Sequence, residues 1–262
     1  MIAVLIPTYK PGNYIESCLA SIEKQLLAKA DFTVYIALNG SDSSSYVYLK
    51  KILKKFTFKY KLHYFSKAGV SFARNFLIDN SNEDFIIFID DDDIISPNYL
   101  SELAKVTTSE IMGISNISNF FKSPSEQRSN YIGASFKKLK KIETSKIKSR
   151  KYYSSPCAKM LHRNMLANCR FDTSLARGED SLFMAKISKN IKAVQKTPSN
   201  TYYFVYEREG STTRRKVSKK EEMKRIRYLL GEYFKLFIKK DYDRLFIFTR
   251  ILATLKHIKN LF

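Results

Sequence analysis

The sequence predicts an α/β fold with a mostly parallel central sheet flanked by helices, because short apolar runs alternate with helical segments over the first hundred residues. Three of these runs are continuous rather than alternating, which is typical of strands buried on both faces: 2–6, 33–38 and 85–89. In such sheets ligands bind beyond the carboxyl ends of the strands. We therefore expect the site in the polar loops that follow the runs: 7–12, 39–43 and 90–96.

The remaining elements follow from spacing. Apolar residues at 15, 18, 19, 22 and 26 predict a helix over 14–27, with Asn13 placed to cap it. Helices are also expected at 46–56, 69–78 and 156–168, strands at 61–65 and 202–206, and a helical tail from about 219. Residues 120–155 are rich in Ser and Lys and predict a loop or mobile flap. The pattern changes near residue 115, and we expect the chain to divide into 1–115, 116–215 and a basic amphipathic helical tail at 216–262.

The charge and the cysteine content of the chain limit the kinds of partner and compartment that we expect. The 262 residues include 46 Lys or Arg and 25 Asp or Glu, so 46 − 25 gives a net charge of +21. Such a chain favours anions: nucleic acid, anionic lipid head groups or phosphorylated substrates. The three cysteines, Cys18, Cys157 and Cys169, have no metal-binding spacing and fit a reducing compartment. The first residues lack the pattern of a signal peptide, and no run of 18 apolar residues occurs, so a cytoplasmic location is expected.

Four consecutive aspartates, Asp90 to Asp93, follow the most strand-like segment. One interpretation is a solvated acidic turn or a helix N-terminus, where carboxylates are favoured; Asp93 in particular could cap the helix that follows. The other is a divalent cation site, because carboxylates suit Mg²⁺ or Mn²⁺ and phosphate oxygens can complete the shell. Four like charges at the end of a buried strand favour the cation.

Four segments in this order resemble the family 2 glycosyltransferases, which have the GT-A fold: Ile2 to Lys10, Leu38 to Asp42, Gly69 to Asn75 and Phe88 to Asp93. They look like the opening strand with its nucleotide-contacting turn, the Asp-Asp-Gly-Ser turn, the Gly-x-x-x-Ala-Arg-Asn helix start and the Asp-x-Asp-Asp metal motif. The second half resembles the family more loosely, at 159–161, at 171–183 with its Glu179-Asp180 pair, and at 202–211 with Arg208, Gly210 and Ser211.

The resemblance implies an inverting, metal-dependent transfer of a hexose or N-acetylhexosamine from a UDP-sugar, giving a β-linkage. It also implies that 1–115 is the nucleotide-sugar-binding half and 116–215 the acceptor-binding half of the same domain. Asp180 would be the general base; a covalent double displacement through a second carboxylate is not excluded by the sequence. Asp92 would ligate Mn²⁺ or Mg²⁺, and Asp90 the metal or the ribose. Arg74 would support the aspartates or the diphosphate, the alternative being a surface arginine. The implied donor-binding residues are Pro7, Thr8, Tyr9, Asn39, Gly69, Arg74, Asp90, Asp91 and Asp92, and the acceptor-binding residues are Glu179, Lys159 and His162.

One position departs from the family. Asn39 replaces an aspartate that in relatives helps to read the nucleobase, and Leu38 replaces the other. An amide still hydrogen-bonds a uracil edge, so a UDP-sugar remains the expected donor.

Two basic segments suggest what the acceptor carries and where the protein is located. Residues 137–163 contain ten Lys or Arg and one Glu, net +9. A sugar linked through diphosphate to a lipid would explain this, as would a solvated loop; the family resemblance points to O-antigen, capsule or lipooligosaccharide assembly. Residues 216–262 carry net +8 and a helical apolar stripe at 245, 248, 251, 252, 255, 258 and 262. This tail predicts binding to the anionic inner leaflet of the cytoplasmic membrane, the alternative being packing on the catalytic domain or on a second subunit in a homodimer.

Two other function classes compete with the enzyme. A nucleic-acid-binding protein would explain the charge, but no known nucleic-acid-binding motif is visible and the aspartates would repel a phosphate backbone. An inactive glycosyltransferase-like scaffold is the other. We expect no nucleic-acid partner.

Overall fold

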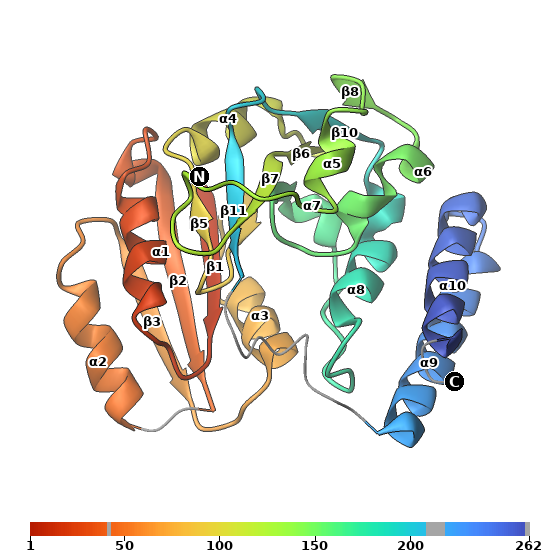
Figure 1. Ribbon diagram of the computed structural model, residues 1–262, viewed down its shortest axis with the longest axis horizontal. Coiled ribbons are helices and arrows are strands. Elements are labelled where there is room, and N and C mark those ends of the chain that lie inside the picture. The colour runs from red at the N-terminus through yellow and green to blue at the C-terminus, as the bar shows by residue number, and fades with distance from the viewer. Residues whose placement is uncertain (41–42, 208–217, 260–262) are drawn as a thin grey trace.

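The computed structural model describes residues 1–40, 43–207 and 218–259 (Figure 1). It confirms the predicted mixed α/β fold. The larger sheet has the strand order β3-β2-β1-β4-β9-β6-β10-β8, and a smaller one has the order β5-β11-β7. Their bounds are β1 (Ile2–Thr8), β2 (Phe32–Asn39), β3 (Tyr60–Phe65), β4 (Phe85–Phe88), β5 (Ile94–Ile95), β6 (Ile111–Ile114), β7 (Asn116–Phe120), β8 (Ile142–Glu143), β9 (Lys159–His162), β10 (Ala193–Lys196) and β11 (Tyr202–Tyr206).

The first half of the large sheet is parallel, as the continuous apolar runs predict. β1 pairs in parallel with β2 on one side and β4 on the other, and β2 pairs in parallel with β3. Every residue of β1 and β2 is buried, because the flanking helices cover the sheet. This parallel register brings the carboxyl ends of β1, β2 and β4 to one edge.

Three helices cover this half: α1 (Tyr14–Glu23), α2 (Ser43–Leu53) and α3 (Val70–Asp79). Figure 1 shows α2 at the outer margin of the molecule, beside the edge strand β3. Asn13 is placed at the start of α1, as the sequence predicts. Asn13 is the N-cap residue, but its side chain makes no capping bond and instead accepts a hydrogen bond of 3.2 Å from the Tyr48 hydroxyl.

The expected helix at 156–168 is also wrong. Its first part is β9, an antiparallel strand inserted between β4 and β6, and only one helical turn, α7 (Arg163–Leu166), follows. Pairing with strands on both sides satisfies the backbone of β9, so tertiary context outweighs local propensity.

The segment expected as a loop or flap has no helix or strand over 121–132 but contains short elements beyond them. It contains α5 (Gly133–Phe136), β8, α6 (Lys146–Ser149) and a short 3₁₀ helix (Arg150–Tyr153), and Phe136, Tyr152 and Tyr153 are buried. These aromatic side chains anchor the segment, although charged residues dominate its composition.

The last helices belong to the same body as the sheet. The chain continues through α4 (Tyr99–Val106) and α8 (Glu179–Ile187) to a hairpin of α9 (Lys219–Phe237) and α10 (Arg244–Lys259), at the right of Figure 1. One hydrophobic core runs from Ile2 to Ile247 and includes Leu229, Tyr233 and Phe246 of the hairpin. No helix in the described ranges is long and apolar enough to span a bilayer.

Candidate active site

The site begins where β1 and β2 end. The Thr8 hydroxyl donates a hydrogen bond to the Asp91 carboxylate. The Asn39 amide donates to the Thr8 carbonyl at 2.7 Å, and its oxygen accepts from the Gly69 backbone N–H at 2.9 Å. Asn39 therefore joins the ends of two strands to the start of α3, and its buried amide serves the fold.

Pro7, Tyr9 and Gly69 lie around this junction. Pro7 is buried within β1, whereas Tyr9, directly beyond the strand, is 48% exposed. Gly69 has a φ of +149°, a conformation that disfavours a side chain, and it directly precedes α3. This turn starts the helix that carries Arg74 into the interior.

The four aspartates divide into two pairs. Asp90 and Asp92 are half-buried and Asp91 and Asp93 are buried. Asp93 accepts a hydrogen bond of 2.9 Å from the Tyr206 N–H, and burial, reinforced by the charges of Asp90 and Asp92, raises its pKa well above the ordinary value. The interpretation of Asp93 as a helix cap is wrong, since its carboxylate joins the loop to β11.

Arg74 connects this loop to the second half of the chain. Its side chain is 4% exposed, and its guanidinium lies 2.6 Å from an oxygen of Asp180 and 3.0 Å from one of Asp90. Burial alone would lower the pKa of Arg74, but the two carboxylates outweigh it and raise the pKa. The structure thus excludes the surface-arginine alternative, because Arg74 is buried and contacts Asp90 of the aspartate loop.

The acidic pair stands at the start of α8. Gly178 precedes the helix with a φ of +88°, in the left-handed region. Burial raises the pKa of Glu179 to about 7, with a further contribution from the Asp180 charge. Burial also raises the pKa of Asp180, although Arg74 opposes the shift. A carboxyl with a raised pKa is a better proton acceptor than an ordinary one.

Lys159 lies inside the protein rather than on an acceptor surface. It is 1% exposed, and its ammonium group donates to the backbone carbonyls of Ser155 and Cys157, the latter at 2.7 Å. Burial lowers its pKa to about 7, although the charges of Cys157 and Asp180 oppose the shift. Lys159 therefore holds the turn that leads into β9, and the expectation that it binds acceptor directly is wrong.

His162 is remote from the aspartates. Because β9 is antiparallel to β4, His162 pairs with Phe85 at the amino end of β4, whereas Asp90 follows the carboxyl end. Its Nδ1 accepts a hydrogen bond from the Asn164 N–H and so caps α7. The acceptor-binding expectation for His162 is wrong.

Two further residues support the aspartate loop and were not predicted as site residues. The Asp90 N–H donates to the Tyr203 hydroxyl at 3.1 Å, and the Cys18 thiol faces the Asp90 carbonyl at 3.7 Å. No local signal in the sequence identifies them, because β11 and α1 are far from the aspartates along the chain. Ser41, Asp42, Arg208, Gly210 and Ser211 lie outside the described residues.

The exposed carboxylates fit a divalent cation. Within the described ranges no three His, Cys, Asp or Glu side chains form a ready-made cation site. Asp90 and Asp92 nevertheless keep partial exposure at the strand end. Two carboxylates completed by water and phosphate oxygens are typical of protein-bound Mg²⁺, so the donor set suits such an ion.

Comparisons with known proteins identify relatives of this chain. The poly(ribitol-phosphate) β-N-acetylglucosaminyltransferase TarS of Staphylococcus aureus is 24% identical over 210 residues, 79% of this chain, and the match spans 36% of TarS. Glycosyltransferase GlyA of Streptococcus pneumoniae is 31% identical over 107 residues, 40% of this chain and 14% of GlyA. The chain thus spans about a third of TarS and less of GlyA.

Solved structures show the same fold. A TarS fragment in complex with UDP-GlcNAc superposes with a TM-score of 0.74 and 20% identity, covering 97% of this chain and 71% of that one. The mannosyltransferase PcManGT of Pyrobaculum calidifontis, in complex with GDP-Man and Mn²⁺, superposes with a TM-score of 0.62 and 14% identity, covering 97% of this chain and 68% of that one. Residues 3–169 match the profile of the family described as Glycosyl transferase family 2, and the chain belongs to that family.

Proposed function

We propose that this protein is an inverting glycosyltransferase that moves a hexose or N-acetylhexosamine from a UDP-sugar to a sugar acceptor. One observation carries the proposal: Arg74 lies between Asp180, the expected base, and Asp90, at the expected donor site. These contacts support a reaction in which an acid–base group acts beside a diphosphate. The UDP and UDP-GlcNAc complexes of TarS support the choice of donor.

In the reaction, the acceptor hydroxyl oxygen bonds to the anomeric carbon while the bond from that carbon to the diphosphate breaks. Asp180 receives the hydroxyl proton, and UDP leaves with the electron pair. Arg74 holds Asp180 in place and keeps a positive charge beside Asp90. A Mn²⁺ or Mg²⁺ ion held by Asp90 and Asp92 would supply Lewis-acid stabilisation of the charge on the leaving diphosphate.

Asp180→Asn tests the base. It should retain UDP binding with Mn²⁺, measured by calorimetry, and lose transfer by about 10²–10⁴-fold. Asp84→Asn changes an exposed carboxylate outside the site and serves as the matched control. Transfer by Asp180→Asn at the unmodified rate would overturn the assignment. Loss of UDP-sugar hydrolysis in Asp92→Ala would separate an enzyme from an inactive scaffold or a nucleic-acid-binding protein.

We assign the nucleobase to the junction of Pro7, Thr8, Tyr9 and Asn39. Tyr9 is exposed there, and the bonded Asn39 amide fixes the turn beside it. Calorimetry with UDP, GDP and TDP in the presence of Mn²⁺ tests the base preference. Tighter binding of GDP than of UDP would contradict the proposed donor.

The acceptor is proposed to carry phosphate, in the form of a sugar linked through diphosphate to a lipid. The basic segment 137–163 supports this, and TarS is named for a β-linked transfer to a ribitol-phosphate polymer. Such an acceptor would place the protein at the inner face of the cytoplasmic membrane, in O-antigen, capsule or lipooligosaccharide assembly. Equal transfer rates to a lipid-diphosphate sugar and to the same sugar without phosphate would contradict this role of charge.

A further inference from the structure

The α9–α10 hairpin exposes a group of large apolar side chains. We name this group the hairpin apolar face, and its members are between 39% and 66% exposed: Phe234, Ile238, Leu245, Phe248, Leu252 and Leu255. The rings of Phe237 on α9 and Phe248 on α10 lie 6.5 Å apart, so the two helices contact each other at this face. Apolar patches shared by neighbouring elements mark interaction sites more often than scattered single residues do.

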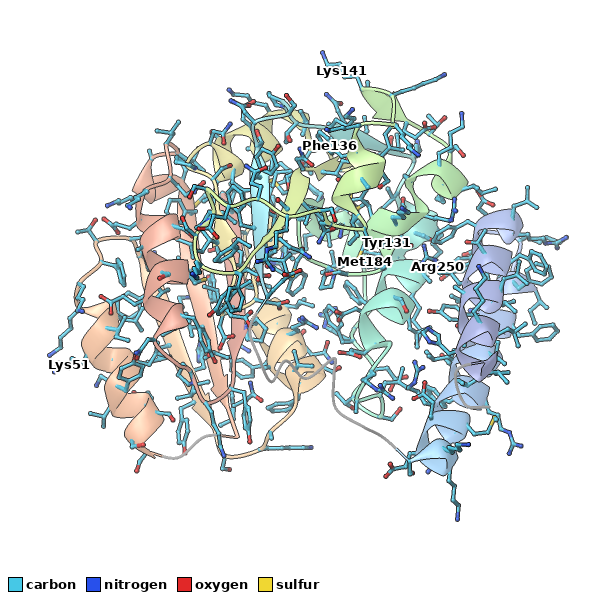
Figure 2. The ribbon with its side chains drawn as sticks, in the orientation of Figure 1. Lys51, Tyr131, Phe136, Lys141, Met184 and Arg250 are labelled. Atoms are coloured by element: carbon cyan, nitrogen blue, oxygen red, sulfur yellow. The ribbon has the colours of Figure 1, made fainter. Side chains whose placement is uncertain are left out.

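This face is not the side of α10 that packs on the body. Phe246, Ile247 and Thr254 are buried, and the Arg250 guanidinium donates to the Arg150 carbonyl. Figure 2 labels Arg250 on the side of α10 that faces α8. Of the apolar stripe seen in the sequence, Ile251 packs against the core, whereas Leu245, Phe248, Leu252 and Leu255 are exposed. The stripe is therefore only partly docked on the body.

The acidic and the basic residues of the hairpin differ in their contacts. Three of its acidic residues pair with basic residues of the body: Glu222 with Arg177, Glu232 with Lys186 at 3.1 Å, and Asp241 with Lys189 at 2.7 Å. Glu221 closes the capping box of α9 with Ser218. The basic residues Arg227, Lys239, Lys240, Arg244 and Lys256 are exposed, and no ion pair holds them within the described part of the chain. Lys239, Arg244 and Lys256 directly adjoin Ile238, Leu245 and Leu255 in the sequence, so a cationic rim borders the hairpin apolar face.

We infer that the hairpin apolar face binds the surface of an anionic lipid bilayer. Apolar side chains would enter the boundary between head groups and acyl chains, while the Lys and Arg side chains meet lipid phosphates. A second copy of the chain fits less well, because a symmetric contact would bring two cationic rims together. The inference deepens the proposed function, since it rests on a lipid-linked acceptor for its purpose, but binding to lipid is measured without any transfer.

The experiment is sedimentation of the full chain with vesicles of phosphatidylcholine containing about one third phosphatidylglycerol, at about 0.1 M salt. The unmodified protein should sediment with these vesicles and stay in solution with pure phosphatidylcholine. The double variant Phe248→Ser/Leu252→Ser should bind about tenfold more weakly or worse. Leu26→Ser/Val47→Ser, which removes two exposed apolar side chains from the other half of the molecule, is the matched control and should bind normally.

Two double variants that reverse charge separate the electrostatic contribution to vesicle binding from the apolar one. Lys239→Glu/Lys240→Glu should weaken binding by about tenfold or more, whereas Lys51→Glu/Lys54→Glu, with the same change of charge, should not. Figure 2 shows Lys51 on the opposite side of the molecule from the hairpin. Each variant is first checked for UDP binding in the presence of Mn²⁺. Unchanged UDP binding shows that a loss of vesicle binding is not a loss of folding.

Three results would overturn the inference. The first is an unmodified chain that binds UDP but does not sediment with the anionic vesicles; this leaves the proposed transfer intact. The second is normal vesicle binding by Phe248→Ser/Leu252→Ser. The third is a chain that is dimeric by analytical ultracentrifugation, becomes monomeric in that variant and binds vesicles in neither form, because the face would then be a contact between copies. Conversely, vesicle binding by a protein that transfers no sugar would count against the proposed function alone.

Discussion

Arg74 is the buried cation on which the two carboxylates of the site depend. Replacement by Met would leave Asp90 and Asp180 without their positive partner, and we expect the free energy of unfolding to fall by roughly 3 kcal/mol. Lys at this position keeps the charge but not the two-pronged contact, so Arg74→Lys should fold more stably than Arg74→Met and still transfer sugar at least about tenfold more slowly than the unmodified enzyme. Urea unfolding and single-turnover transfer measure the two effects.

The stability of Arg74→Met tests whether the guanidinium offsets the two carboxylates. If Arg74→Met unfolds at the same urea concentration as the unmodified protein, the guanidinium does not offset the two carboxylates. Arg128→Met is a suitable control, because that arginine pairs with Glu207 on an exposed surface, where ion pairs contribute little.

Lys159 makes folding stability depend on pH. Its pKa is about 7 in the folded protein and near 10.5 when the chain is unfolded, so between these values the unfolded chain binds more protons. The stability that Lys159 governs therefore rises with pH above 7, by at most roughly 1.4 kcal/mol per pH unit. Lys159→Met should lack this rise. Urea unfolding of both proteins at pH 7 and pH 8, taken as a difference, cancels the other titrating groups.

If the stability difference between Lys159→Met and the unmodified protein is the same at both pH values, the buried ammonium does not titrate in this range. The donor site of Lys159→Met is checked separately. UDP binding in the presence of Mn²⁺ shows whether the donor site remains intact.

Among the elements, the start of α8 depends on a glycine. Gly178 has a positive φ, and a Cβ added there would lie 2.9 Å from Leu229 and 3.1 Å from Arg225, both on α9. Gly178→Ala should therefore destabilise the protein by roughly 1–3 kcal/mol and shift the acidic pair that follows. Transfer should fall with it. Thermal unfolding and transfer assays measure both.

Gly231 gives the matched control. It lies within α9, and a Cβ added there would meet no atom within 4 Å. Gly231→Ala should stabilise the protein by about 0.5–1 kcal/mol, because alanine loses less conformational freedom in a helix. Equal effects of the two substitutions would show that neither the backbone conformation nor the approach of α9 constrains Gly178.

The elements also show what sequence patterns can predict. β1, β2 and β4 are continuous apolar runs, and their parallel pairing follows from the helices between them. β9 could not be predicted in this way, because its partners β4 and β6 come from distant parts of the chain. On α10 apolar residues occur on two sides, so periodicity does not indicate which side packs on the body.

In the molecule as a whole, some site residues can likewise be predicted from sequence patterns, whereas others depend on contacts between distant parts of the chain. Thr8 and Asn39 end parallel strands and Asp90 follows one, so the fold class predicts that they lie together. Arg74 and Asp180 meet across 106 positions of sequence, and resemblance to a family suggested both before their contact was known. The sequence does not predict the places of Lys159 and His162, because the antiparallel direction of β9 puts His162 at the amino end of β4 and Lys159 is buried by packing. Direction and burial are tertiary properties that one sequence does not display.

The single core implies that the donor half and the hairpin unfold together. Leu229 is 2% exposed and belongs to this core, so Leu229→Ala should cost roughly 2–4 kcal/mol although it is on the last part of the chain. The circular-dichroism signal and UDP binding should then be lost in one thermal transition, at a lower temperature than in the unmodified protein.

Ligand binding gives a second measure of this coupling. Saturating UDP with Mn²⁺, at about 100 times its dissociation constant, should raise the free energy of unfolding by roughly 2.7 kcal/mol. Leu252→Ala, on the exposed side of α10, should change stability by less than about 0.5 kcal/mol. Two separate transitions, with UDP raising only one of them, would instead show that the hairpin is an independent unit.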